Sequence, residues 1–150
     1  MKISTKGRYA LEAILYMAHL VGYEPVAIRQ IADDTGISEK YLEQLFFALR
    51  KKGIISAVRG PKGGYYIARK FGELTAGEIV RALEGDLAPV PCLKENSECD
   101  FQLDYCITKG IWQKVIGIID SVLDTTTIAF LLTDYERLIQ EKKQQADYCI

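Results

Sequence analysis

A chain of 150 residues, 49% apolar and 26% charged, suits one folded domain, or a small domain with an oligomerisation arm, and excludes a disordered protein. The first residues lack a long apolar run, so we expect no signal peptide. Charge or glycine interrupts the longest apolar runs, so we expect no membrane-spanning segment and no membrane partner. We therefore expect a cytoplasmic protein. Its four cysteines are expected to be metal ligands or redox thiols rather than a disulfide framework.

The net charge of −1 hides a difference between the two halves of the chain. Residues 1–73 carry 12 Lys and Arg against 7 Asp and Glu, whereas residues 74–150 carry 7 against 13. This asymmetry indicates a half that faces nucleic acid and a half with another task.

The first predicted helix is capped by Ser4 or Thr5 and carries apolar residues at helical spacing until Gly22 and Pro25 end it. His19, near its end, is interpreted as a surface or packing residue rather than a ligand. A second helix is predicted over 28–35.

Gly36 permits a turn after the second helix, and Ser38 is placed to cap a third. This is the order of a helix-turn-helix motif. Its inner face is expected to contain Ile37, Leu42, Leu45 and Leu49. The residues left to face outward are Glu39, Lys40, Tyr41, Glu43 and Gln44, at the part of such a helix that meets base edges in the major groove.

Two short strands, IISAV and YYIA, flank a glycine-rich tip and predict a wing. The tip carries two cations and no acid, which suits phosphates or a minor groove. A plain hairpin is the alternative, but the helix-turn-helix directly before it favours the wing. The predicted DNA-binding residues are Lys2, Ser4, Arg29, Ser38, Glu39, Lys40, Tyr41, Glu43, Gln44, Arg59, Gly60, Pro61 and Lys62.

Three helices are predicted in the second half. Thr75 and Glu78 form a capping box for a short helix that Gly85 stops. A long helix is expected from near Asp104 to Leu123, with an apolar stripe that needs a partner. The last is expected over 128–140, followed by a frayed polar tail. The stripe consists of Ile107, Ile111, Val115, Ile118, Ile119 and Val122.

Three cysteines, Cys92, Cys99 and Cys106, lie at even spacing after a linker with two prolines. Thiolates select iron–sulfur clusters, zinc or Cu(I) over hard cations. The spacing also fits buried or redox-active cysteines, because zinc and iron–sulfur motifs usually use closer CxxC pairs. Cys149, next to the end of the chain, is interpreted as a bystander.

Enzyme motifs are missing from the sequence. One histidine allows no Ser/His/Asp set, and neither a phosphate loop, an HExxH motif nor a paired-acid site is found. We therefore expect no enzyme and no small-molecule substrate. The alternative from another class is a winged-helix adaptor that binds protein and carries no cluster.

Three segments together resemble the bacterial winged-helix regulators typified by IscR, NsrR and CymR. They are MKISTKGRYALEAILYMA, ISEKYLEQLFFALRKKGIISAVRGPKGGYYIA and LTAGEIVRALEG, which span nearly the first 90 residues. The resemblance implies a homodimer held by a long helix and bound to an imperfect DNA palindrome. The cysteine segment resembles the iron–sulfur branch, IscR above all. It implies that Cys92, Cys99 and Cys106 hold a cluster, with 2Fe-2S favoured over 4Fe-4S.

The chain departs from the family pattern at the cluster. Lys109 stands where IscR-like proteins have a histidine, and each interval between the cysteines is one residue longer. Arg8 stands where NsrR-like proteins have an acid. The fourth ligand is therefore open. The candidates are Cys149, Asp104, Glu98, His19 from the partner subunit, an exogenous thiol or water.

The sequence thus predicts a mainly α fold, a winged helix-turn-helix with a small β-hairpin wing and a long C-terminal dimerisation helix. Residues 1–85 form the DNA-binding domain, 86–106 the cluster-binding loop, and 104–150 the dimerisation and C-terminal helices. The expected function is a DNA-binding transcriptional regulator, a repressor, that senses iron–sulfur or redox status. A regulator of cysteine metabolism or nitric-oxide response on the same scaffold is the alternative.

Overall fold

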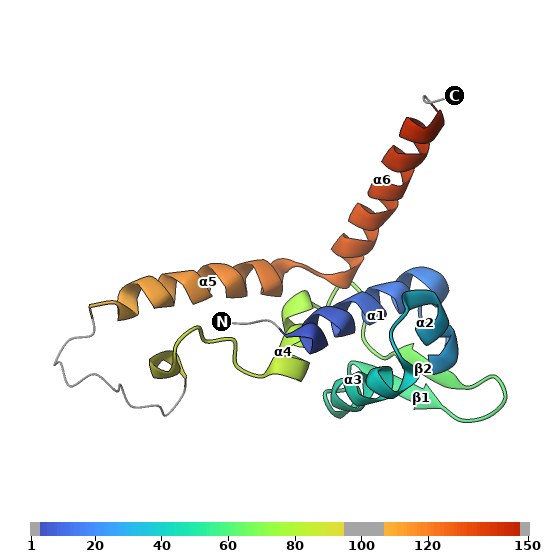
Figure 1. The fold of residues 1–150 in the computed structure, drawn as a ribbon, viewed down its shortest axis with the longest axis horizontal. Coiled ribbons are helices and arrows are strands. Elements are labelled where there is room, and N and C mark those ends of the chain that lie inside the picture. Colours follow the sequence, from blue (N-terminus) through green and yellow to red (C-terminus); the bar gives the residue numbers. More distant parts are fainter. Residues whose placement is uncertain (1–3, 95–106, 148–150) are drawn as a thin grey trace.

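The structure, a computed structural model, describes residues 4–94 and 107–147. Within them the fold is mainly helical, with a two-stranded antiparallel sheet (Figure 1), as predicted. The elements are α1 (Thr5–Val21), α2 (Ile28–Thr35), α3 (Glu39–Lys51), β1 (Ile55–Val58), β2 (Gly64–Ile67), α4 (Ala76–Glu84), the 3-10 helix η1 (Pro91–Leu93), α5 (Lys109–Thr125) and α6 (Ile128–Asp147).

Helices α2 and α3 form the predicted helix-turn-helix. Gly36 adopts a left-handed φ of 73° after α2, and its N–H donates to the carbonyl of Ala32. The Ser38 hydroxyl then caps α3 by accepting from the backbone N–H of Tyr41. All four residues predicted for the inner face are buried, so the apolar pattern identified it correctly. They are Ile37, Leu42, Leu45 and Leu49.

The hairpin pairs Ile55 with Ile67 and Val58 with Gly64. Its second strand also bridges Val26, whose backbone exchanges hydrogen bonds of 2.9 Å with Tyr65. A Cβ on Gly64 would lie 2.2 Å from the Val26 carbonyl oxygen, so only glycine allows this approach. The bridge anchors the tip-side end of β2 to the loop between α1 and α2.

A single apolar core holds together helices α1 to α4 and the hairpin, here called the wing unit. Phe46 is fully buried and its ring meets the ring of Tyr65 edge-on, with centroids 4.9 Å apart. Ile128, the first residue of α6, is also fully buried in this core. The start of α6 is therefore fixed to the wing unit, and the rest of the helix projects from it (Figure 1).

Two predicted boundaries in the second half were wrong. Helix α5 begins at Lys109, not near Asp104, because Ile107 and Thr108 form a turn although Ile107 continues the apolar spacing. Helix α6 runs to Asp147, so the tail expected to fray is helical. Its sequence is rich in good helix formers, and Arg137 pairs with Asp134 and Glu141 at helical spacing.

Candidate nucleic-acid interface and cysteine segment

The outer face of α3 presents unpaired polar groups. Ser38, Glu39, Lys40, Glu43 and Gln44 are all exposed. Across residues 4–94 and 107–147, the side chains of Lys40, Glu43 and Gln44 form no hydrogen bond or ion pair. Their donors and acceptors are therefore available to an external partner.

Two aromatic residues of α3 differ from the sequence interpretation. Tyr41 was expected to face outward, but it is half-buried against the core and meets the Tyr9 ring edge-on, with centroids 6.0 Å apart. Phe47 was not singled out, yet it is 74% exposed on the face that carries Lys40, Glu43 and Gln44. The helical period gave the signal, because it places Phe46 inside and its neighbour outside.

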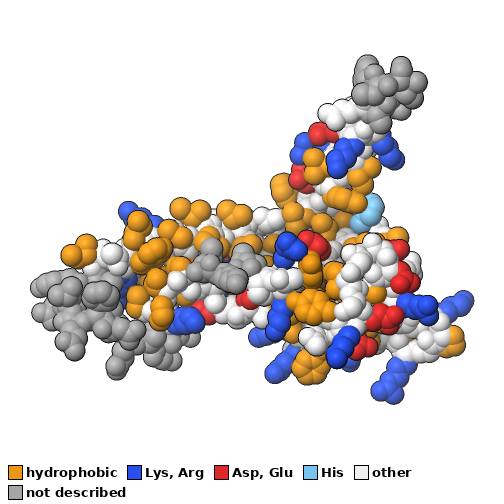
Figure 2. Space-filling model, viewed as in Figure 1, with side chains coloured by type: hydrophobic (Ala, Val, Ile, Leu, Met, Phe, Trp, Pro, Cys, Tyr) orange, Lys and Arg blue, Asp and Glu red, His pale blue; other side chains and the backbone are white. Residues whose placement is uncertain are grey.

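The tip of the hairpin exposes Arg59, Gly60, Pro61 and Lys62. The Gly63 N–H closes the turn by donating to the Gly60 carbonyl over 2.9 Å. Neither Arg59 nor Lys62 has an ion pair with any residue that the structure describes. Figures 1 and 2 show the hairpin and α3 on the side away from α6, with Lys and Arg side chains gathered around them.

The other predicted DNA contacts lie elsewhere. Ser4 caps α1, and both its N–H and its hydroxyl donate to Glu84, so its polar groups are already engaged. Arg29 on α2 is exposed, with its Nε 4.0 Å from Asp33 Oδ2. Lys2 lies outside the described residues.

Glu84, at the end of α4, joins this helix to the N-terminus of α1. Its Oε1 accepts from the N–H groups of Ser4 and Gly7 over 3.0 and 2.9 Å. Burial alone would raise the pKa of Glu84, but the hydrogen bonds from Ser4 and Gly7 outweigh burial and lower it. A negative charge here also complements the positive end of the α1 dipole.

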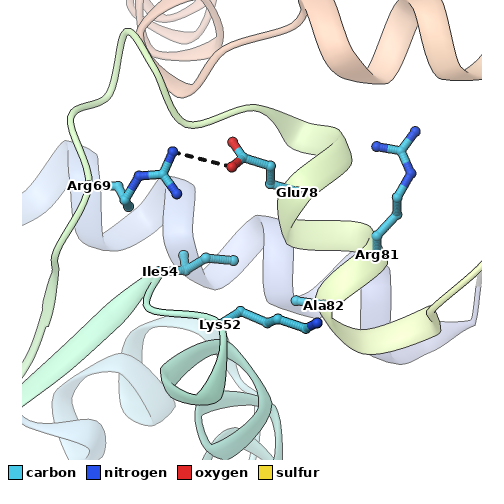
Figure 3. Close-up of a pocket in the computed structure, with 6 residues that line it drawn as sticks. All are labelled: Lys52, Ile54, Arg69, Glu78, Arg81 and Ala82. Atoms are coloured by element: carbon cyan, nitrogen blue, oxygen red, sulfur yellow. Dashed lines mark ion pairs between the residues drawn. The ribbon is translucent and has the colours of Figure 1, made fainter.

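A pocket of about 260 Å³ lies beside the end of α3 and is bordered by α4 and by Arg69, which follows β2 (Figure 3). Arg69 pairs across it with Glu78, with Nη2 3.2 Å from Oε1. Arg81 points away from Lys52 and pairs instead with Asp120 and Asp124 of α5. Hydrogen bonding to Asp124 raises the pKa of Arg81, against the effect of burial. The two ion pairs of Arg81 connect α5 to α4.

Helix α5 extends from the wing unit with a largely uncovered apolar face (Figures 1 and 2). None of its residues is buried. Ile111, Ile118 and Val122 are 59%, 67% and 59% exposed. Contiguous apolar surface of this kind marks an interaction site.

One of the three clustered cysteines is described. Cys92 is half-buried, has a free thiol and lies in η1, which packs against α5. Cys99 and Cys106, with the candidate ligands Cys149, Asp104 and Glu98, lie outside the described residues. The described ranges alone contain no group of three metal-binding side chains. His19 is exposed and packs edge-on against Tyr135 at 4.9 Å between centroids.

The helix-turn-helix with its cation-tipped hairpin defines a winged-helix DNA-binding protein. Residues 3–134 match the model of the Rrf2 family, described as iron-dependent transcriptional regulators. The chain belongs to this family. It is accordingly a DNA-binding transcriptional regulator. In the described residues we find no helix both long and apolar enough to cross a membrane.

Similar proteins include Protein rrf2 of Nitratidesulfovibrio vulgaris (strain Hildenborough), 40% identical over 134 residues, 89% of each chain. The HTH-type transcriptional regulator CymR of Bacillus subtilis is 38% identical and covers 85% of this chain and 87% of its own. The solved structure of T. potens IscR superposes with a TM-score of 0.74 and 38% identity, over 92% of this chain and 90% of that one. Overall similarity thus links the chain to IscR and CymR alike, and both the family description and the name of CymR denote transcriptional regulators.

Proposed function

We propose that this regulator is a homodimeric repressor that reads an imperfect palindrome with α3 and the wing, and that a cluster held by Cys92, Cys99 and Cys106 controls its affinity. The observation that carries the DNA-reading part is the unpaired polar face of α3 beside a cation-tipped hairpin. A protein-binding adaptor would need neither feature.

In this proposal, each exposed polar side chain of α3 makes a different contact with DNA. Gln44 can pair bidentately with adenine, and Lys40 can donate to guanine or to a phosphate. Glu43 can accept from cytosine but is repelled by phosphates, so it restricts the sequences bound more than it adds affinity. Arg59 and Lys62 approach the backbone or a narrow minor groove from the wing.

The uncovered face of α5 supports a dimer. Two such helices packed about a two-fold axis would cover Ile111, Ile118 and Val122 in both subunits. The axis would also hold two copies of α3 at a fixed spacing, as two half-sites of a palindrome require. Bound across a promoter, the dimer would exclude polymerase and repress the gene.

The donor set supports an iron–sulfur cluster, because three thiolates are soft ligands and the family is described as iron-dependent. A cluster bound at the three cysteines, 2Fe-2S in our proposal, would supply a group that can change its redox state or be lost. The chain offers a route for this coupling, because the 3-10 helix that contains Cys92 contacts α5, and Arg81 pairs α4 with α5. A change at Cys92 would therefore alter the angle between the two wing units.

A regulator of cysteine metabolism is the second candidate. It is favoured by the 38% identity to CymR and by the similarity to the solved structure of CymR, the global cysteine regulator of B. subtilis. A regulator of this kind would read DNA with the same face of α3 but would not bind a cluster.

Selection of bound duplexes from a random pool tests the DNA-reading part. We expect an enriched inverted repeat, and Gln44→Ala should lose affinity for its preferred base by about 1–3 kcal/mol. Glu43→Ala should accept a wider set of sequences. Equal weakening on all sequences by both variants would contradict direct readout by these residues.

Anaerobic purification with iron and sulfide analysis, visible absorbance and EPR tests the cluster. We expect a coloured protein with iron and acid-labile sulfide. A colourless, iron-free protein that cannot be reconstituted would exclude the cluster and favour the CymR-like function.

A further inference from the structure

Phe47 is a large apolar side chain that the fold leaves uncovered. It is 74% exposed, whereas its neighbour Phe46 is fully buried in the core. It follows Gln44 by three residues and Lys40 by seven, so the three side chains share one stripe of α3. The core does not need Phe47, which therefore requires an explanation outside the core.

The surroundings of Phe47 favour DNA as the molecule that covers it. An open groove of about 410 Å³ is lined by Lys40, Glu43, Gln44 and Phe47, so polar and charged groups border the ring. The unpaired cations Arg59 and Lys62 lie on the nearby wing. A protein partner that buried this ring would also have to desolvate the charges of Lys40 and Glu43, whereas the major groove offers partners for both.

Among the base-pair edges in the major groove, the 5-methyl group of thymine is the one apolar feature. We propose that Phe47 contacts a thymine methyl group in each half-site and thereby helps to determine which operators are bound. This inference rests on the proposed insertion of α3 into the major groove. Gln44 and Phe47 are separated by about 4.5 Å along the helix axis, so the bases they read are neighbours or next neighbours.

The test removes the methyl group without changing any hydrogen bond. Each thymine of the selected operator is replaced in turn by deoxyuridine, and binding is measured for the wild type and for Phe47→Ala. For the wild type we expect one symmetric pair of thymines whose replacement weakens binding about fourfold per half-site, the effect of one buried methyl group. For Phe47→Ala the same replacement should have no effect.

Leu20→Ala is the matched control, because Leu20 is an exposed apolar residue of α1, at 44%, outside the proposed interface. It should show the wild-type response to deoxyuridine. A wild type insensitive at every thymine would overturn the inference, and so would an unchanged deoxyuridine penalty in Phe47→Ala. A lower oligomeric state of Phe47→Ala in light scattering would also overturn it, by placing Phe47 at a contact between copies. Failure of the wild type to bind any duplex would instead overturn the proposed function.

Discussion

The substitution Ile118→Glu tests whether the apolar face of α5 holds a dimer. Ile118 is 67% exposed, and it lies between Ile111 and Val122 on the same face. In the proposed dimer both copies of this side chain become buried. A glutamate would bring two carboxylates into the same apolar contact, where each loses hydration.

The size of the effect follows from the exposure of Ile118. Burying a whole isoleucine side chain contributes about 1.5–3 kcal/mol, so burying the exposed two-thirds contributes about 1–2 kcal/mol. Because the two-fold axis buries two copies, the total contribution is about 2–4 kcal/mol. Its loss would raise the dimer dissociation constant roughly 30- to 700-fold, before any cost of burying the charge.

Analytical ultracentrifugation at micromolar concentration measures the dimer, and titration with the palindrome measures its consequence for DNA. We expect Ile118→Glu to be monomeric and to lose tight binding, while its helical CD spectrum below the melting transition remains that of the wild type. Gln113→Glu is the matched control, because it adds the same charge to an exposed position on another face of α5. A monomeric wild type, or a dimeric Ile118→Glu, would refute the reasoning.

Three other predictions concern the wing, Glu84 and the cysteines. Arg59→Ala should weaken DNA binding and reduce the slope of log K against log salt by about one. Lys70→Ala should leave the slope unchanged, because Lys70 lies outside the wing tip and already pairs with Glu73. An unchanged slope in Arg59→Ala would show that the wing does not contact DNA. Glu84→Gln should lower the melting temperature at neutral pH. Because the folded-state pKa of Glu84 is lowered, its stabilisation is full above the ordinary carboxyl pKa of about 4.3 and is lost as pH falls through the folded value. The difference from wild type should therefore vanish in acid, and a pH-independent difference would show that the charge is not responsible. Cys99→Ala should abolish the cluster and Cys149→Ala should spare it; a full cluster in Cys99→Ala would contradict the ligand assignment.

The helix-turn-helix could be predicted from the sequence because local signals and the apolar period agree there. Gly36, Ser38 and the spacing of Leu42, Leu45 and Leu49 each indicate the same boundaries, and the structure has them. The capping box of Thr75 likewise marks the start of α4. Agreement between independent local signals is what makes such a prediction reliable.

Other features depend on contacts that a local pattern does not contain. The half-burial of Tyr41 depends on Tyr9, more than thirty residues away. The hydrogen bonds from Ser4 and Gly7 to Glu84 join residues that are 80 and 77 positions apart in the sequence. The start of α5 was misplaced because apolar spacing continues through Ile107 into a turn. The exposure of Phe47, in contrast, was accessible from the helical period alone.

The prediction for the cysteines rests on residue type and resemblance more than on spacing. Cys92 has the position beside α5 that coupling to a dimer helix requires, and its thiol is free. Lys109, the first residue of α5, stands where the resemblance to IscR-like proteins implies a histidine. Its ammonium group is not an iron ligand, so the fourth ligand of the proposed cluster comes from another group.

In the proposed function, the cluster state controls binding to a palindromic operator. The most direct measurement is an anaerobic titration of one selected operator with matched cluster-containing and cluster-free samples of the wild-type dimer. We expect both samples to be folded dimers whose dissociation constants differ by about tenfold or more. Equal dissociation constants for the two samples on every selected operator would contradict this proposal.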